Sequence, residues 1–128
     1  MRIVLWSSLL LLSGCFADPV DTQTLGKATF DQHCASCHGK QAQGLSDDWK
    51  QRLPNGKFPA PPLNGTAHAW HHSPQTLMRT INEGGVKLGG WMPGFANQLS
   101  EQEKQALIDY IYSLWPQSIQ RRYDKRFK

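Results

Sequence analysis

An all-α fold is predicted for this chain of 128 residues. No segment shows the alternation of apolar and polar residues that is typical of half-buried strands. Three segments carry helical spacing instead, and long loops rich in glycine and proline join them. The length allows one domain with a modest core, because 39% of the residues are hydrophobic. A covalently bound cofactor would supply part of the stability that so small a core lacks.

The first helix is predicted from about Thr24 to Cys37. Gly26, Phe30 and Cys34 recur every four residues and therefore lie along one side of it. A glycine inside a helix costs about 1 kcal/mol relative to alanine. Gly26 is therefore interpreted as a point of close approach to another element.

Residues 39–73 are predicted to be mostly loop, with a short helix near Asp47–Arg52. A second helix follows, in which Ser73 is the N-cap, Pro74 occupies the first position and Gly84 is the stop signal.

The last predicted helix has the strongest signal. Ser100 and Glu103 form a capping box at its start. An apolar stripe follows and ends before Pro116; it consists of Leu107, Tyr110, Ile111 and Leu114.

The net charge of +4 is concentrated at the C-terminus. Residues 121–128 contain five basic residues and one acidic residue, whereas outside them and Arg2 the chain has eight basic and nine acidic residues. A nearly neutral body speaks against a nucleic-acid partner. Residues 117–128 are predicted to form a solvated, frayed basic tail, although such a tail could also contact anionic lipid or an acidic partner.

The stretch DQHCASCHGK places Cys34 and Cys37 three positions apart, with His38 directly after them. Structural zinc, a redox disulfide and covalent haem all use a Cys-x-x-Cys pair. Zinc usually needs a second ligand pair, and no second cysteine pair follows. A thioredoxin-like disulfide belongs to a βαβ unit, and no strand pattern is present.

Haem attachment fits every element of this motif. Residues three apart project from one side of a helical turn, so the two thiols can add to the two vinyl groups of one porphyrin. His38 would then be held beneath the iron, where an imidazole nitrogen can bind it.

The N-terminus has the layout of a secretory signal peptide. Arg2 precedes an apolar run that ends at Leu12, and small residues follow. The run is short for a membrane-spanning helix, and the order of charge and apolar residues favours a signal peptide over a buried helix. Export would deliver the chain to the periplasmic side of a bacterial envelope, where haem is attached.

The sequence is consistent with two cleavage sites for the signal peptide. The LSGC sequence that ends at Cys15 resembles the bacterial lipobox, which implies a signal peptide of residues 1–14, a lipid on the Cys15 sulfur and a tether of residues 15–24. The rival is cleavage after Ala17, which gives a signal peptide of residues 1–17. The lipoprotein route is preferred because it also explains the third cysteine.

Beyond the haem motif, the chain resembles the class I cytochromes c over most of its length, roughly Leu25 to Trp115. The sequence CASCH matches the family's haem-binding motif, and APPLNG at 60–65 resembles its Pro-x-Leu-x-Gly loop. The sequence WMPGF at 91–95 resembles its axial methionine loop, and LIDYIYSLW at 107–115 is similar to its C-terminal helix.

The resemblance implies a cytochrome c domain of residues 25–116, with its N- and C-terminal helices packed across each other and its loops wrapped around one covalent haem c. The backbone carbonyl of Pro61 would accept a hydrogen bond from His38, the proximal iron ligand. Met92 would be the distal iron ligand, and Trp91 would pack against the haem. Met92 also stands out by itself, because it lies in a glycine-opened loop outside any helical stripe and a thioether raises an iron's potential.

The sequence HAWHH contains His68, His71 and His72 and has two interpretations: a copper site or alternative axial ligand, and a polar loop. The loop is preferred because no soft ligand or regular spacing accompanies the histidines. Trp49 and Trp70 are interpreted as shielding the porphyrin.

Iron bound by histidine on one side and methionine on the other has no open position for a substrate. The expected function is therefore one-electron transfer between Fe(III) and Fe(II), without catalysis by the chain itself. The alternatives are a haem c subunit or electron-entry module of a periplasmic oxidoreductase, and a ligand-binding haem sensor. Expected partners are redox proteins that dock transiently at the haem edge and a membrane reached through Cys15, with no nucleic acid or small-molecule substrate.

Overall fold

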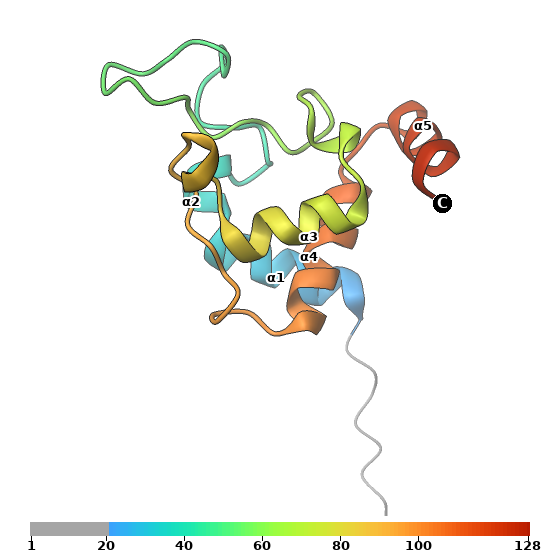
Figure 1. Cartoon of the computed structure of the whole chain (residues 1–128). Helices are drawn as coiled ribbons and strands as arrows, with labels where there is room; N and C mark the ends of the chain where they lie inside the picture. Colours follow the sequence, from blue (N-terminus) through green and yellow to red (C-terminus); the bar gives the residue numbers. More distant parts are fainter. Residues whose placement is uncertain (1–20) are drawn as a thin grey trace, which may run out of the picture.

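The structure of the chain is a computed structural model that describes residues 21–128. The predicted all-α fold is confirmed, because this part of the chain forms helices and loops without a strand. Figure 1 shows the arrangement of these elements. The helices and 3₁₀ turns are α1 (Thr22–His33), α2 (Ala35–His38), η1 (Ala69–His71), α3 (Pro74–Glu83), η2 (Val86–Leu88), α4 (Glu101–Ser113) and α5 (Gln117–Phe127).

Helices α1 and α4 pack across each other and form the main helix pair (Figure 1). Their backbones meet at Gly26, where an added methyl group would overlap the carbonyl oxygen of Ala106 and lie 2.7 Å from Cβ of Tyr110. Next to this contact, the rings of Phe30 and Tyr110 lie 5.5 Å apart. The close approach predicted for Gly26 is confirmed.

Replacing Gly26 with alanine is expected to destabilise the fold by about 3 kcal/mol, because a backbone carbonyl cannot move aside as a side chain can. Chemical denaturation of the haem-loaded chain measures this loss. Gln32→Ala, at an exposed position of the same helix, is the matched control and should change stability by less than about 0.5 kcal/mol. Equal stability of Gly26→Ala and the parent chain would contradict the close contact.

Two details of the first half of the chain differ from the prediction. The first helix ends at His33, and Cys34 is its C-cap with a φ of −119°, so Cys37 belongs to the separate turn α2. The helix predicted near Asp47–Arg52 is wrong, because this segment consists of turns and bends. Six mostly polar residues have no apolar side to bury, and an isolated helix of that length is not stable in water.

Helices α3 and α4 begin as predicted. The hydroxyl of Ser73 accepts a hydrogen bond from the backbone N–H of Thr76 at 3.2 Å. Both halves of the capping box between Ser100 and Glu103 are present. These caps are local hydrogen bonds within three residues, which is why the sequence alone predicts them well.

The C-terminal residues form helix α5, so the prediction of a frayed tail is wrong. Tyr123 is only 3% exposed, and its ring lies 4.9 Å from that of Trp115. Tyr112 donates a hydrogen bond to the carboxylate of Asp124 at 2.8 Å. Among the many basic residues of this segment, every fourth residue is apolar: Ile119, Tyr123 and Phe127. This apolar row packs against the core and attaches the helix to α4.

Within residues 21–128, no helix is both long enough and apolar enough to cross a bilayer. The predicted signal peptide of residues 1–14, the lipid on Cys15 and the alternative cleavage after Ala17 lie outside the described residues. Helix α1 begins inside the predicted tether, at Thr22, where the Asp21 side chain accepts hydrogen bonds from the backbone.

Candidate haem site

Cys34 and Cys37 lie at the junction of α1 and α2, and both are free thiols. Cys34 is buried and Cys37 is half-buried. Burial, with the neighbouring Cys37 as a smaller cause, raises the pKa of Cys34 to about 11. Cys34 is therefore a neutral thiol at neutral pH, and not the thiolate that zinc prefers. Within residues 21–128, no three histidine, cysteine or acidic side chains lie close enough to hold a metal between them.

His38 is buried at the end of α2. Its Nδ1 atom lies 2.8 Å from the backbone carbonyl oxygen of Pro61. Because a carbonyl can only accept, Nδ1 carries the proton and donates it, which leaves the lone pair of Nε2 free. Nε2 has no hydrogen-bond partner among residues 21–128. Burial lowers the pKa of His38, so the ring is neutral at neutral pH, the form that binds metals.

The turn that follows α2 holds the Pro61 segment over the His38 ring. The backbone N–H of Leu45 donates to the carbonyl of Ala60 at 3.0 Å, and that of Leu63 donates to Ala42 at 2.8 Å. These bonds fix the backbone on both sides of Pro61. Ala42 is fully buried and has a φ of +55°, a left-handed conformation that costs a non-glycine residue about 1–2 kcal/mol.

Trp115, just beyond the C-terminal end of α4, secures the same segment from the other side. Its indole N–H donates to the carbonyl of Leu63 at 2.8 Å. Neither Ala42 nor this role of Trp115 is among the features predicted from the sequence. The only sequence signal for the tryptophan is its place at the end of LIDYIYSLW, and nothing in the sequence marks Ala42.

Met92 lies in a loop that is attached to the end of α3. The carbonyl of Met92 accepts a hydrogen bond from the N–H of Gly85 at 3.0 Å, and the N–H of Phe95 donates to Ile81 at 2.8 Å. Gly84 has a φ of +74°, and an added methyl group there would overlap the Met92 carbonyl. Met92 itself is half-buried and packs against the core. Helix α3 therefore sets the position of this methionine through backbone contacts.

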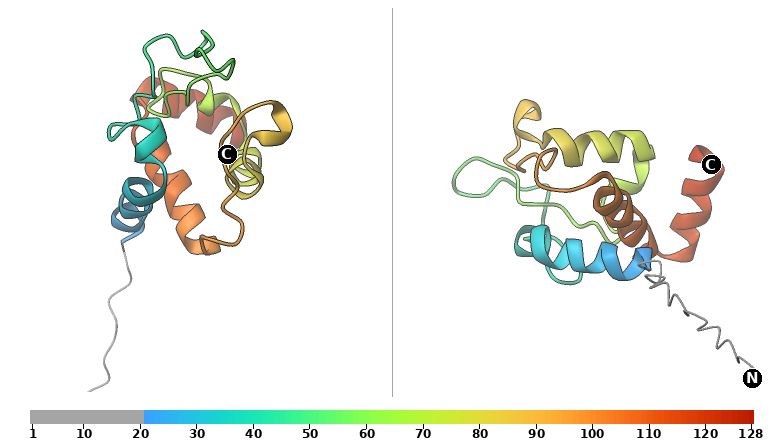
Figure 2. Two further views of the ribbon diagram at one scale, coloured as in Figure 1. Left: turned by 90° about the vertical axis from the view of Figure 1, so that its left-hand side faces the viewer. Right: turned by 90° about the horizontal axis from the view of Figure 1, so that it is seen from below.

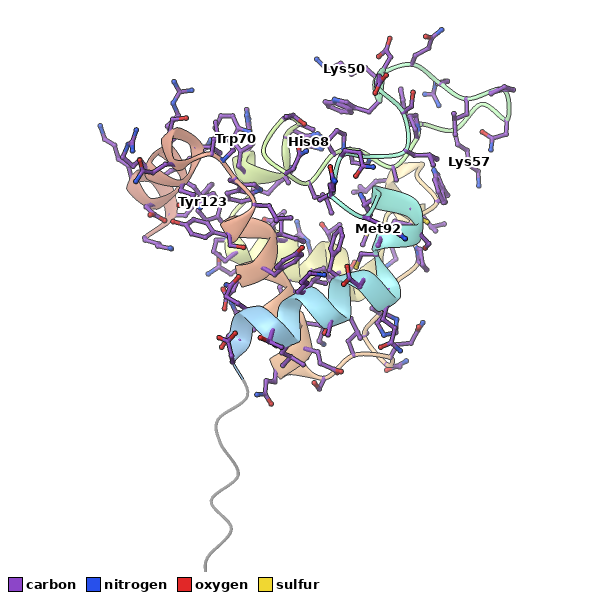
Figure 3. The ribbon with its side chains drawn as sticks, turned by 180° about the vertical axis from the view of Figure 1, so that it is seen from behind. Lys50, Lys57, His68, Trp70, Met92 and Tyr123 are labelled. Carbon is purple, nitrogen blue, oxygen red and sulfur yellow. The ribbon has the colours of Figure 1, made fainter. Side chains whose placement is uncertain are left out.

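The two halves of the candidate site lie at one end of the molecule but on different sides of it. Figure 1 shows α2 and η2 at the same end, and the left view of Figure 2 shows them apart, on the two sides of the chain. Figure 3 labels Met92 at this end. A link between the loops is the indole N–H of Trp91, which donates to the carbonyl of Phe58 at 2.7 Å.

This donor set fits a haem c. The motif offers two free thiols and a neutral buried imidazole whose Nε2 has no hydrogen-bond partner among the described residues. A thioether lies in the loop on the other side of this end.

The remaining histidines and tryptophans form aromatic pairs. The His68 ring stacks on Trp49 at 5.1 Å and lies 5.5 Å from His72, while Trp70 lies 3.9 Å from His71. Burial and the two neighbouring histidines lower the pKa of His68. Figure 3 shows Trp70 near Tyr123, and His68 between Trp70 and the loop that carries Lys50. Shielding of a porphyrin by Trp49, Trp70 and Trp91 remains a prediction.

Comparison with known proteins identifies a family. Residues 21–111 match the family model described as "Cytochrome C oxidase, cbb3-type, subunit III". The CcoP subunit of the cbb3-type cytochrome c oxidase from Rhodobacter capsulatus is 35% identical over 113 residues, which cover 83% of this chain and 33% of that protein. The CcoP subunit from Azospirillum brasilense is 32% identical over 90 residues, or 70% of this chain and 27% of that protein.

The FixP subunit of the cbb3-type oxidase from Sinorhizobium medicae is 32% identical over 95 residues, or 70% of this chain and 29% of that protein. The chain thus spans a third or less of the length of these curated relatives. No solved structure matches it.

Proposed function

The chain belongs to the cbb3-type cytochrome c oxidase subunit III family, and we propose from this membership that it is a haem c module that passes single electrons within an oxidoreductase complex. The similar proteins are oxidase subunits, which favours the subunit alternative over a free carrier. The module transfers electrons and leaves the catalysis to another subunit. The observation that carries the proposal is His38, whose Nδ1 is bound to Pro61 and whose Nε2 is left free for iron.

Each side chain of the site has one task in this proposal. Cys34 and Cys37 hold one haem through two thioether bonds, because the chain contains a single Cys-x-x-Cys-His motif. The haem supplies an iron that changes oxidation state by one electron. His38 and Met92 would bind that iron, and the Pro61 carbonyl would orient the imidazole and make it a stronger electron donor.

Partners and location follow from the same proposal. The partners are the other subunits of a cbb3-type oxidase or a related complex, and the electron donor docks transiently near the haem. The predicted signal peptide places the module on the periplasmic side of a bacterial envelope. A lipid on Cys15 would hold it at the membrane; cleavage after Ala17 would release it. No nucleic acid or small-molecule substrate takes part.

Purification of the tagged full chain from its own host tests this proposal. We expect it to retain oxidase subunits in a fixed ratio through detergent and moderate salt, because a subunit interface is larger than a transient redox contact. Deleting the chain should slow the flow of electrons from the periplasmic donors to oxygen. A haem-loaded chain that purifies alone, and whose deletion leaves that flow unchanged, would contradict the proposal.

A further inference from the structure

Helix α5 exposes a dense basic face. Its four cations are exposed and occupy two adjoining rows of the helix, because the members of each row are four positions apart. They are Arg121 and Lys125 in one row and Arg122 and Arg126 in the other. Among the described residues none of the four forms an ion pair, whereas the nearby Lys128 is paired with Asp124 at 2.9 Å.

The apolar side of α5 is already occupied within the chain. Tyr123 is buried and packs on Trp115, and Ile119 and Phe127 lie against the same core. The helix therefore has no apolar face left to insert into a bilayer or a partner. The basic rows are therefore the largest feature that α5 presents to another surface.

The basic face of α5 lies far from the candidate haem site. Figure 1 and the right view of Figure 2 both show α5 and the start of α1 at the end of the molecule that is remote from α2 and η2. Figure 3 likewise shows Tyr123 of α5 far from Met92. The basic face thus lies at the end where α1 begins, and the candidate haem site lies at the other.

We propose that the basic face of α5 binds an anionic lipid surface and so orients the domain with its haem end away from the membrane. The occupant follows from charge complementarity: four unpaired cations on one helix suit a surface of phosphate headgroups. Outside this tail the chain is nearly neutral and has no comparable run of cations. This inference rests on the proposed export of the chain to the cell envelope.

Binding of the full haem-loaded chain to lipid vesicles tests this inference. One set of vesicles contains phosphatidylcholine alone, and the other an equimolar mixture of phosphatidylcholine and phosphatidylglycerol. Each basic residue near an anionic surface raises the partition coefficient about fivefold. Changing Arg121, Arg122, Lys125 and Arg126 to glutamine removes four such factors and should lower binding to the anionic vesicles by about two to three orders of magnitude. High salt should release the parent chain, because the Debye length shrinks to about 3 Å at 1 M.

The matched control removes the same charge from exposed lysines outside α5: Lys40, Lys50, Lys57 and Lys87. Figure 3 shows Lys50 and Lys57 on the long loop, away from Tyr123. The inference is supported if the control variant still binds the anionic vesicles and the α5 variant does not. Equal loss in both variants, or equal binding of the parent chain to both kinds of vesicle, would overturn it. The haem spectrum of each variant reports haem binding separately, and purification with oxidase subunits reports the proposed function, so a failure of lipid binding can be told from a failure of either.

Discussion

Changing Cys34 and Cys37 together to alanine is expected to abolish covalent retention of haem. Both thiols are free and lie at the α1–α2 junction, so each can form one thioether bond to the same porphyrin. Without them the haem is held only by iron ligation and packing, which denaturation removes. Haem staining of the denatured chain after electrophoresis measures the loss. Each single variant should retain some haem through the remaining bond.

The third cysteine of the chain supplies the matched control. Cys15→Ser should leave haem staining unchanged, because Cys15 belongs to the predicted processing site and not to the haem motif. The same variant should lose a lipid if the chain is processed as a lipoprotein. Covalent haem that persists in the double variant of Cys34 and Cys37 would refute the attachment site.

Changing Met92 to alanine is expected to open one axial position of the iron. The methionine–iron charge-transfer band should disappear, and the reduced protein should bind carbon monoxide at neutral pH. The potential should fall by on the order of 0.1 V or more, since axial ligands set haem potentials over about 0.8 V. Optical spectra and a redox titration measure these changes. The loop should stay in place, because Gly85 bonds to the backbone carbonyl of Met92 and not to its side chain.

Met78→Ala is the control for this variant. Met78 lies in α3 and is half-buried against the core, so its loss should lower stability by about 1–2 kcal/mol and leave the charge-transfer band intact. A band that survives in Met92→Ala would show that another residue is the sixth ligand. Carbon monoxide binding by the unmodified chain would favour the alternative of a ligand-binding haem sensor.

The features that the sequence predicts well are those set by neighbouring residues. The caps at Ser73 and Ser100 need only a hydroxyl and a backbone N–H three positions on. Gly26 is informative because a glycine inside a helix is costly unless another backbone approaches it. The Cys-x-x-Cys-His spacing of the candidate site is also a local pattern.

The features that escape prediction depend on distant parts of the chain. Ala42 adopts a left-handed conformation because its carbonyl must meet the N–H of Leu63, and no local pattern encodes that requirement. Helix α5 is stabilised because Tyr123 packs against Trp115, although the basic residues around Tyr123 suggest a solvated tail. The segment Asp47–Arg52 shows the reverse case: its local pattern allows a helix that no packing partner supports.

The central claim is that one haem is bound covalently at Cys34 and Cys37. It is tested most directly by mass spectrometry of a tryptic digest of the full chain, after maturation in a host that attaches haem. Cleavage after Lys27 and Lys40 releases a peptide of residues 28–40, which contains both cysteines and His38. We predict that this peptide carries the mass of one haem. The same peptide at its unmodified mass, from a colourless protein, would contradict the claim.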